Sequence, residues 1–240
     1  MTSPLRRHPG KQGMLAGLVA SIPIMLGYFP IAFSFGISAL QAGINPWVTA
    51  ATSIFIYAGA AQFILIALLA AGGSWLTVVP TIILVNLRHL FYGPALIHRL
   101  RPANTPAHFP TALLAYGLTD EVFAAALARL DRIPAATRES WYAGLQLGAY
   151  SAWVGGTIVG ITIGQSTPQN SAFITALLTF ILPALFFTLL LESSSPRRYR
   201  TMLITAVATG LLQTLLPTHH ALIAGMLIGA SFAMIRPVYE

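Results

Sequence analysis

Arg88 and His89 stand next to each other inside an apolar stretch that runs from Trp75 to Leu96. A charged side chain within a transmembrane helix costs about 2.5–3.5 kcal/mol on insertion scales, so such residues usually face a partner, a water-filled cavity or a substrate. The planar guanidinium of Arg88 can bind a carboxylate through two hydrogen bonds, and a histidine can carry a proton near neutral pH. Asn86 and Tyr92 lie within about one helical turn and add hydrogen-bonding groups. The alternative is a structural ion pair, or an arginine that extends toward the membrane surface.

Two adjacent acids, Asp120 and Glu121, interrupt a later apolar segment. At 1.5 Å of rise per residue, Asp120 lies about 15 Å and Arg88 about 10 Å from the same edge of the membrane, so the two side chains can pair. A carboxylate whose cationic partner moves when a ligand arrives can exchange a proton. We therefore expect Asp120 and Glu121 to be proton-coupling residues. The alternative is a permanent salt bridge that fixes helix packing.

Prolines interrupt the first apolar segment at Pro23 and Pro30. Backbone groups without helical partners are tolerated at membrane depth only where they line a cavity or are covered by protein. We therefore expect a kinked or interrupted first helix, with Tyr28 and Pro30 at a binding pocket. In the second segment, Tyr57 and Gln62 are polar groups among small residues, and we expect them at the same pocket, with helix packing as the alternative.

The composition indicates an integral membrane protein. Of 240 residues, 56% are hydrophobic and only 8% are charged, and the mean hydropathy is +0.74; in a soluble domain about a quarter of the residues are charged. The formal net charge of +7 comes from Lys and Arg that are spread along the chain without forming a basic stripe, so no nucleic-acid partner is expected. Cysteine is absent, and no motif predicts a metal site or another cofactor.

The elements that position these residues are expected to be transmembrane helices, because about 20 apolar residues cross about 30 Å of hydrocarbon. We expect an all-α fold with a single transmembrane domain over residues 1–240. Similar hydropathy in the two halves suggests internal repeats over residues 13–129 and 141–236, with a substrate pocket between them. Eight spans are predicted, at residues 14–40, 47–71, 75–97, 110–129, 141–163, 171–191, 201–216 and 219–235.

The cationic residues predict the orientation of these spans, because Lys and Arg are enriched in cytoplasmic loops. With eight spans and the N-terminus inside, both termini are cytoplasmic, and only Arg99 and Arg101 fall on the outer side. The cytoplasmic set is Arg6, Arg7, Lys11, Arg129, Arg132, Arg138, Arg197, Arg198, Arg200 and Arg236.

Glycines at four-residue spacing predict places where helix backbones approach closely. We assign these glycines to helix packing or to a subunit interface. They are Gly13 with Gly17, Gly156 with Gly160 and Gly164, and Gly225 with Gly229.

Four segments, taken together, resemble the AzlC family, which comprises the large subunits of bacterial branched-chain amino-acid exporters. The resemblance covers most of the first 125 residues, while the second half is similar mainly in hydropathy. The segments are Gly27-Tyr28-Phe29-Pro30-Ile31-Ala32-Phe33-Ser34-Phe35-Gly36, Tyr57-Ala58-Gly59-Ala60-Ala61-Gln62-Phe63, Asn86-Leu87-Arg88-His89 with Tyr92-Gly93, and Thr119-Asp120-Glu121.

This resemblance implies export of valine, leucine, isoleucine or methionine across the bacterial cytoplasmic (inner) membrane, together with a small AzlD-like membrane subunit. No ATP-binding motif is present, so an ion gradient is the expected source of energy. We therefore expect a proton-coupled secondary transporter, with an intramembrane enzyme that uses His89, or a structural subunit without a pathway, as alternatives. The substrate-binding residues are expected to be Arg88, Asn86, His89, Tyr57, Gln62, Tyr28 and Pro30.

Overall fold

Every regular element is a helix in the residues that the computed structural model describes, which are 9–70, 72–102, 105, 107–166, 199–216 and 218–235. The all-α prediction is confirmed for these residues. Contacts divide the chain into two compact units, Met1–Leu182 and Pro183–Glu240.

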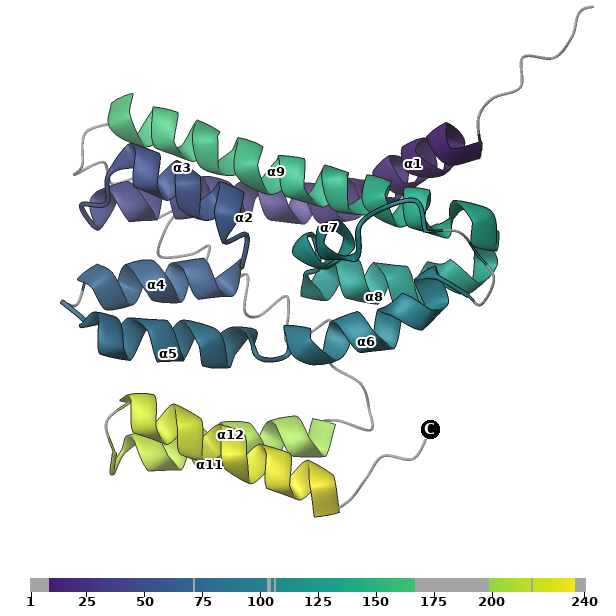
Figure 1. The fold of residues 1–240 in the computed structure, drawn as a ribbon. Helices are drawn as coiled ribbons and strands as arrows, with labels where there is room; N and C mark the ends of the chain where they lie inside the picture. Colours follow the sequence, from purple (N-terminus) through teal and green to yellow (C-terminus); the bar gives the residue numbers. More distant parts are fainter. Residues whose placement is uncertain are drawn as a thin grey trace, which may run out of the picture. The chain divides into compact units, whose positions relative to one another are not determined.

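The first unit carries the residues that the sequence singles out (Figure 1). Two of its helix starts show clear capping: the Asn45 side chain accepts a hydrogen bond from the Trp47 backbone N–H, and the Thr119 hydroxyl accepts one from Val122. Two single-turn 3-10 helices, η1 (Leu130–Arg132) and η2 (Ala135–Thr137), precede α9 (Arg138–Ser166). The α-helices are α1 (Pro9–Ala20), α2 (Ile22–Gln41), α3 (Pro46–Phe55), α4 (Ala60–Ala70), α5 (Trp75–Asn86), α6 (His89–Leu100), α7 (Thr111–Tyr116), α8 (Asp120–Arg129) and α9 (Arg138–Ser166).

The long helix α9 runs parallel to α1 and α2 and packs closely against both (Figure 1). A Cβ atom at Gly17 would lie 1.8 Å from the carbonyl oxygen of Trp141, and one at Gly160 would lie 2.2 Å from that of Phe33. These distances are far below van der Waals contact, so the two backbones approach closely only because side chains are absent. The predicted packing role is therefore confirmed for Gly13, Gly17, Gly156, Gly160 and Gly164.

Replacing Gly17 or Gly160 with alanine is expected to destabilise the first unit by about 1–3 kcal/mol, because the added methyl group overlaps the facing backbone. Thermal unfolding of the purified protein in detergent measures this as a lower Tm. Gly155→Ala is the matched control on α9, since a Cβ there meets no atom within 4 Å. An unchanged Tm for both Gly17→Ala and Gly160→Ala would contradict the close packing.

The first predicted span is interrupted between α1 and α2, at Ser21. Ser21 is fully buried, and its hydroxyl donates a hydrogen bond to the Leu18 carbonyl oxygen at 2.7 Å. Helix α2 then continues through Pro30 without a break. The predicted interruption is confirmed at Ser21 but not at Pro30, because a proline removes one helical hydrogen bond, and a helix supported along its length by α9 tolerates that loss.

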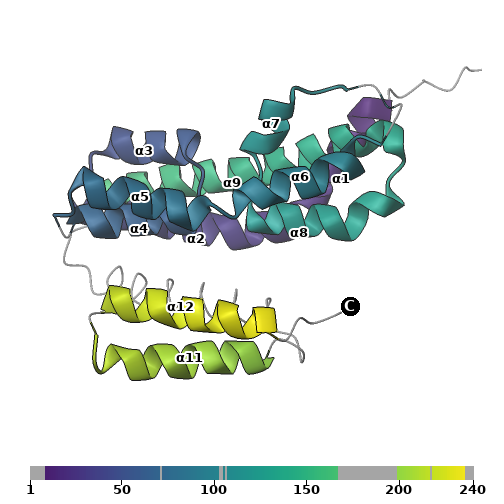
Figure 2. The same ribbon diagram turned by 60° about the horizontal axis from the view of Figure 1, so that its bottom comes forward.

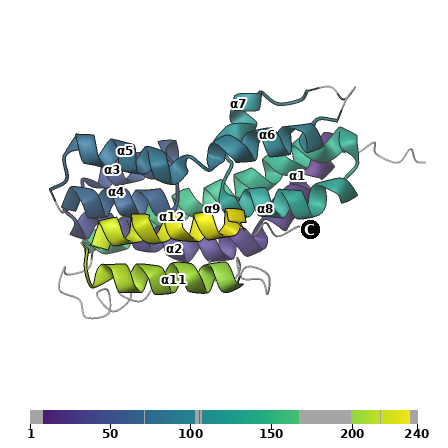
Figure 3. The same ribbon diagram turned by 90° about the horizontal axis from the view of Figure 1, so that it is seen from below.

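Three further predicted spans are also broken near their middles. Residues 56–59 separate α3 from α4, residues 87–88 separate α5 from α6, and residues 117–119 separate α7 from α8. Helices α3 and α4 fold back as a hairpin, so the turn between α4 and α5 lies at the end of the unit where α3 begins (Figures 1 and 3). Helices α5 and α6 instead continue in one direction, from that end of the unit to the other (Figure 2).

Helices α7 and α8 form a second hairpin, which begins and ends at the opposite end of the unit. The Arg101 guanidinium, just after α6, donates to the Thr111 hydroxyl at the start of α7 at 2.8 Å. Arg99 pairs with Asp131, just after α8, at 3.4 Å. Both ends of the hairpin therefore lie beside the end of α6, and residues 110–129 turn back where the sequence predicts a crossing.

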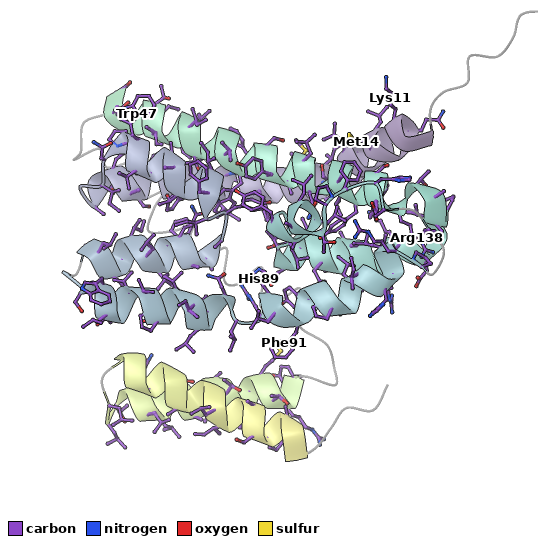
Figure 4. The ribbon with its side chains drawn as sticks, in the orientation of Figure 1. Lys11, Met14, Trp47, His89, Phe91 and Arg138 are labelled. Carbon is purple, nitrogen blue, oxygen red and sulfur yellow. The ribbon has the colours of Figure 1, made fainter. Side chains whose placement is uncertain are left out.

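This hairpin gathers cationic residues at one end of the unit. Arg138 donates a hydrogen bond to the backbone oxygen of Arg99 at 2.8 Å. Figure 4 shows Lys11 and Arg138 at this same end, with Trp47 at the opposite one. The prediction that placed Arg99 and Arg101 across the membrane from Arg138 is therefore wrong, because it counted the α7–α8 hairpin as a crossing.

Three helices among the described residues are long and apolar enough to cross a membrane: Ile22–Gln41, Trp75–Leu100 and Ala135–Ser166. The two hairpins alternate with them along the chain, so the predicted spans 47–71 and 110–129 are not single helices. Large apolar side chains stay exposed, including Trp47 at 84% and Phe55 at 75%, as expected of surfaces in contact with lipid. The predicted span 171–191 lies outside the described residues.

The second unit contains α11 (Tyr199–Gln213) and α12 (Thr218–Ile235), which correspond to the predicted spans 201–216 and 219–235. The two helices pack antiparallel, since Gly225 faces Thr209 and Gly229 faces Thr205. A Cβ at either glycine would lie 1.9 Å from the facing threonine hydroxyl, which confirms the predicted packing role of this glycine pair.

Candidate functional site

The broken ends of the three helix pairs meet in the middle of the first unit. The ring of Tyr57, between α3 and α4, lies 6.4 Å from that of Tyr116, at the end of α7. Arg88, between α5 and α6, contacts Asp120 at the start of α8. Figure 4 shows His89 at the break between α5 and α6. Residues from three segments that are distant in sequence thus form one cluster.

The expected pair between Arg88 and Asp120 is present, with 2.8 Å between the guanidinium Nη2 and the carboxylate Oδ2. The Tyr92 hydroxyl donates a second hydrogen bond to Asp120, at 2.8 Å. The side chains remain 45% exposed for Arg88 and 33% exposed for Asp120. Asp120 also occupies the first turn of α8, where the positive end of the helix dipole stabilises a carboxylate. The pair is accessible enough for a ligand to compete for the arginine.

Glu121 lies beside this pair and contacts a different helix. The Tyr28 hydroxyl, on α2, lies 2.5 Å from the Glu121 carboxylate and 2.7 Å from the Thr119 hydroxyl. Tyr28 is buried, at 6% exposure. The two adjacent acids therefore have different partners: Asp120 faces a cation and Tyr92, whereas Glu121 faces the hydroxyl of a buried phenol.

Tyr57 sits at the tip of the α3–α4 hairpin in a strained backbone conformation, with φ of 41°. A side chain in this left-handed region costs about 1–3 kcal/mol and is found frequently at functional sites. Its ring packs edge-on against Tyr150 at 5.1 Å and lies 6.4 Å from Trp153. The Tyr57 hydroxyl is buried and has no hydrogen-bond partner among the described residues. A buried hydroxyl without a partner is destabilising, so a ligand that supplied one would be favoured.

Gln62 is fully buried, and its hydrogen bonds go to other side chains of the unit. Its amide oxygen accepts from the Trp153 indole N–H at 2.8 Å, and its amide nitrogen donates to the Ser53 hydroxyl at 3.4 Å. Ser53 in turn hydrogen-bonds to Thr157 at 2.8 Å. The geometry at Gln62 supports packing, the alternative that the sequence leaves open, more than substrate contact.

The remaining expected site residues, Asn86, His89 and Pro30, differ in whether their side chains contact the cluster. Asn86 donates to the Ile82 carbonyl oxygen at 2.9 Å, so its side chain amide is tied to its own helix. The His89 ring packs edge-on against the Tyr92 ring, with 5.5 Å between the ring centroids. The Nδ1 atom of His89 lies 3.0 Å from the Asn86 carbonyl oxygen. Pro30 is exposed on α2. His89 therefore belongs to the cluster, whereas Pro30 does not.

Sequence reasoning missed the aromatic side of this cluster. Tyr150 and Trp153 come from α9, more than 25 residues beyond the acidic pair, and they contact Tyr57 and Gln62. The Tyr150 hydroxyl also donates to the Ile54 carbonyl oxygen at the end of α3, at 3.0 Å. Tyr150 and Trp153 are spaced by one helical turn, which indicates a shared face but not which segment that face covers. In the part of the chain that the structure describes, no group of three His, Asp or Glu side chains is arranged to hold a metal ion.

Apolar helices with exposed hydrophobic side chains, interrupted around a charged cluster, define an integral membrane protein of the all-helical class. A family model described as AzlC protein matches residues 23–167, which include all of this cluster. The chain belongs to the AzlC family.

Similar proteins support this assignment. The chain is 38% identical to the inner membrane protein YgaZ of Escherichia coli, over 97% of this chain and 94% of that protein. It is 39% identical to an uncharacterized membrane protein of Archaeoglobus fulgidus, over 77% of each chain. It is 25% identical to the branched-chain amino acid transport protein AzlC of Bacillus subtilis, over 72% of this chain and 64% of that protein. No solved structure matches the chain.

Proposed function

We propose that this protein is the large subunit of a secondary transporter that exports valine, leucine, isoleucine or methionine in exchange for protons. Its similarity to a relative named as a branched-chain amino acid transport protein supports the substrate class. The observation that carries the proposal is the Arg88–Asp120 pair, held between broken helices and partly exposed. Discontinuous helices around charged groups are a common way to build a transport site at membrane depth.

In this mechanism, the substrate competes with Asp120 for Arg88. The carboxylate of the amino acid binds the guanidinium, and the amino group takes the place of the arginine beside Asp120, so neither charge is left unpaired. Tyr92 donates a hydrogen bond to Asp120, and His89 packs on Tyr92, so the two residues orient the carboxylate of Asp120.

Glu121 is the proposed site of proton exchange. It lies beside the substrate site and against the Tyr28 hydroxyl, which can accept a hydrogen bond from the protonated carboxyl or donate one to the carboxylate. Arrival of the positively charged amino group of the substrate favours loss of the proton, and its departure favours uptake. Such a cycle couples substrate and proton movement in opposite directions.

Counterflow in proteoliposomes tests the transport activity. Vesicles that contain the full chain are loaded with unlabelled leucine, and uptake of labelled valine, leucine, methionine and an unrelated organic acid is followed with and without a proton gradient. We propose that a small AzlD-like membrane subunit completes the transporter, so each measurement is made with and without such a subunit. Uptake of the neutral amino acids but not of the acid is expected. Full uptake by the small subunit alone would make this chain a structural subunit.

We further propose that the protein lies in the bacterial cytoplasmic membrane with both termini in the cytoplasm. The end of the first unit that carries Lys11 and Arg138 (Figure 4), together with Arg99, whose backbone oxygen accepts a hydrogen bond from Arg138, is then cytoplasmic, in agreement with the enrichment of cations in cytoplasmic loops. In this orientation the α7–α8 hairpin enters from the cytoplasm and the α3–α4 hairpin enters from the outside.

Single cysteines are expected to label according to this topology, since the chain contains no cysteine of its own. His108→Cys and Ala136→Cys lie before and after the α7–α8 hairpin and should react with a membrane-impermeant maleimide from the cytoplasmic side. Ser74→Cys, between α4 and α5, should react from the outer side and serves as the control. Labelling is compared in inside-out and right-side-out vesicles. Reaction of positions 108 and 136 from opposite sides would restore residues 110–129 as a crossing helix.

A further inference from the structure

A cavity of about 410 Å³ lies between α6, α7 and α9. Its walls are almost entirely apolar, and the side chains come from all three helices. Near one end it is bordered by His98 and Thr111, where Arg101 hydrogen-bonds to Thr111. The aliphatic and aromatic part of the lining includes Leu96, Leu100, Leu114, Leu118 and Tyr142.

Two residues in the lining of this cavity are sequence neighbours of the charged cluster. Gly93, in its lining, directly follows Tyr92, whose hydroxyl donates to Asp120. Leu118, also in its lining, directly precedes Thr119, which contacts Tyr28. Consecutive Cα atoms are about 3.8 Å apart, so the lining of the cavity begins one residue from Tyr92 and two residues before Asp120.

An amino acid with an aliphatic side chain has two parts that require different surroundings. Its charged groups need polar partners, whereas burial of its side chain in an apolar site is favourable by the hydrophobic effect. The charged cluster supplies the polar partners, and the apolar cavity supplies the environment for the aliphatic side chain. A site of this type commonly combines hydrophobic walls with a few convergent polar groups.

We propose that the cavity between α6, α7 and α9 is the subsite for the aliphatic side chain of the substrate and contributes to the choice among aliphatic side chains. This inference rests on the proposed function and adds to it a specificity-determining surface. Arg88 and Asp120 select for the amino acid backbone, and the lining of the cavity distinguishes one aliphatic side chain from another.

Gly93 offers a direct way to change the size of this subsite. A Cβ atom built there meets no other atom within 4 Å, so a small side chain fits without displacing the protein. Ala115, on α7, also lines the cavity and is itself exposed. A larger side chain at Gly93 reduces the cavity from the α6 side, and one at Ala115 reduces it from the α7 side. Neither residue belongs to the charged cluster.

The test is a competition assay in proteoliposomes with the full chain and its small subunit. Inhibition constants of unlabelled valine and leucine against labelled valine are compared for wild type, Gly93→Ala, Gly93→Val and Ala115→Leu. Gly155→Val is the control, because the space around Gly155 is also open and this residue does not line the cavity. Membrane insertion and Tm are checked for each variant.

The ratio of the leucine constant to the valine constant is expected to rise stepwise from wild type through Gly93→Ala to Gly93→Val, by at least about tenfold in total, since one methylene group in a hydrophobic pocket commonly changes specificity by this factor. Ala115→Leu should shift the ratio in the same direction, and Gly155→Val should leave it unchanged. An unchanged ratio in both Gly93→Val and Ala115→Leu, or equal loss of valine and leucine binding through the graded series, would overturn the inference while leaving the proposed function in place. Absence of transport of any neutral amino acid by wild type would instead overturn the proposed function.

Discussion

Arg88→Ala is expected to lower the rate of counterflow at least about 100-fold. The variant removes the cation that is proposed to bind the substrate carboxylate, and it leaves Asp120 without its partner at 2.8 Å. Loss of one member of a buried charge pair typically costs about 2–5 kcal/mol; this pair is partly exposed, and the lower part of that range, about 3 kcal/mol, corresponds to the expected factor of about 100. Initial rates of labelled leucine uptake, normalised to inserted protein, give the measurement.

The double variant Arg88→Ala with Asp120→Asn separates a transport role from a structural one. If the pair only fixed the packing of the helices, a neutral replacement of both charges would restore activity together with stability. We expect the Tm to recover while transport stays near background, because a neutral site cannot hold a carboxylate. The matched control is Arg99→Ala with Asp131→Asn, an exposed pair at 3.4 Å, which should retain nearly wild-type uptake. Recovery of uptake in the double variant at position 88 would contradict the transport role.

Glu121→Gln is expected to abolish accumulation driven by a proton gradient while leaving exchange of leucine across the membrane measurable. The glutamine keeps the size of the side chain and can still contact the Tyr28 hydroxyl, which lies 2.5 Å from the carboxylate in wild type, but it cannot gain or lose a proton near neutral pH. Gradient-driven uptake should fall at least about tenfold, whereas counterflow should change less than about threefold.

Tyr28→Phe provides the companion measurement for Glu121. It removes one hydroxyl from a buried position and leaves the ring that packs edge-on against Trp153 at 5.3 Å. We expect a shift in the pH at which gradient-driven uptake is half-maximal, with the maximal counterflow rate nearly unchanged. Full gradient-driven accumulation by Glu121→Gln would show that the coupling proton is carried elsewhere.

The Arg88–Asp120 pair could be predicted from sequence because it depends on depth and charge alone. Both residues lie inside apolar segments at similar distances from one edge, and a buried cation requires a partner. The role of the glycines at four-residue spacing in packing could be predicted in the same way, since they mark one face of a helix, whereas the pairing of α9 with α1 and α2 is found only in the structure. These features need only the period of a helix and the cost of burying a charge.

The hairpins could not be predicted from hydropathy, because residues 110–129 are apolar enough to cross and the average over a window does not detect a break. The local signals were nevertheless present. Thr119 followed by Asp120 and Glu121 is the pattern of a helix start, with a capping hydroxyl and acids in the first turn. Gly117 directly follows α7. A helix start in the middle of an apparent span is therefore a better indicator of a broken helix than Pro30, which α2 accommodates.

The aromatic surroundings of Tyr57 depend on contacts that no local pattern contains. Tyr150 and Trp153 reach Tyr57 only because α9 lies along the α3–α4 hairpin. The unpartnered hydroxyl of Tyr57 also follows from the way the tip of the hairpin is buried. Sequence alone identifies the polar residue, and the tertiary fold decides whether a ligand can reach it.

The most direct test of the central claim, that Arg88 binds the substrate carboxylate, is a comparison of leucine with leucinamide. Equilibrium binding of labelled leucine to the purified full chain, together with the proposed small subunit, is competed with each compound, for wild type and for Arg88→Ala. Leucinamide keeps the side chain and amino group but has no carboxylate. Wild type should prefer leucine by at least about 100-fold, as expected for a charge-assisted, bidentate contact, and Arg88→Ala should bind both weakly with a ratio near one. A folded Arg88→Ala variant that keeps the wild-type preference for leucine would contradict the claim.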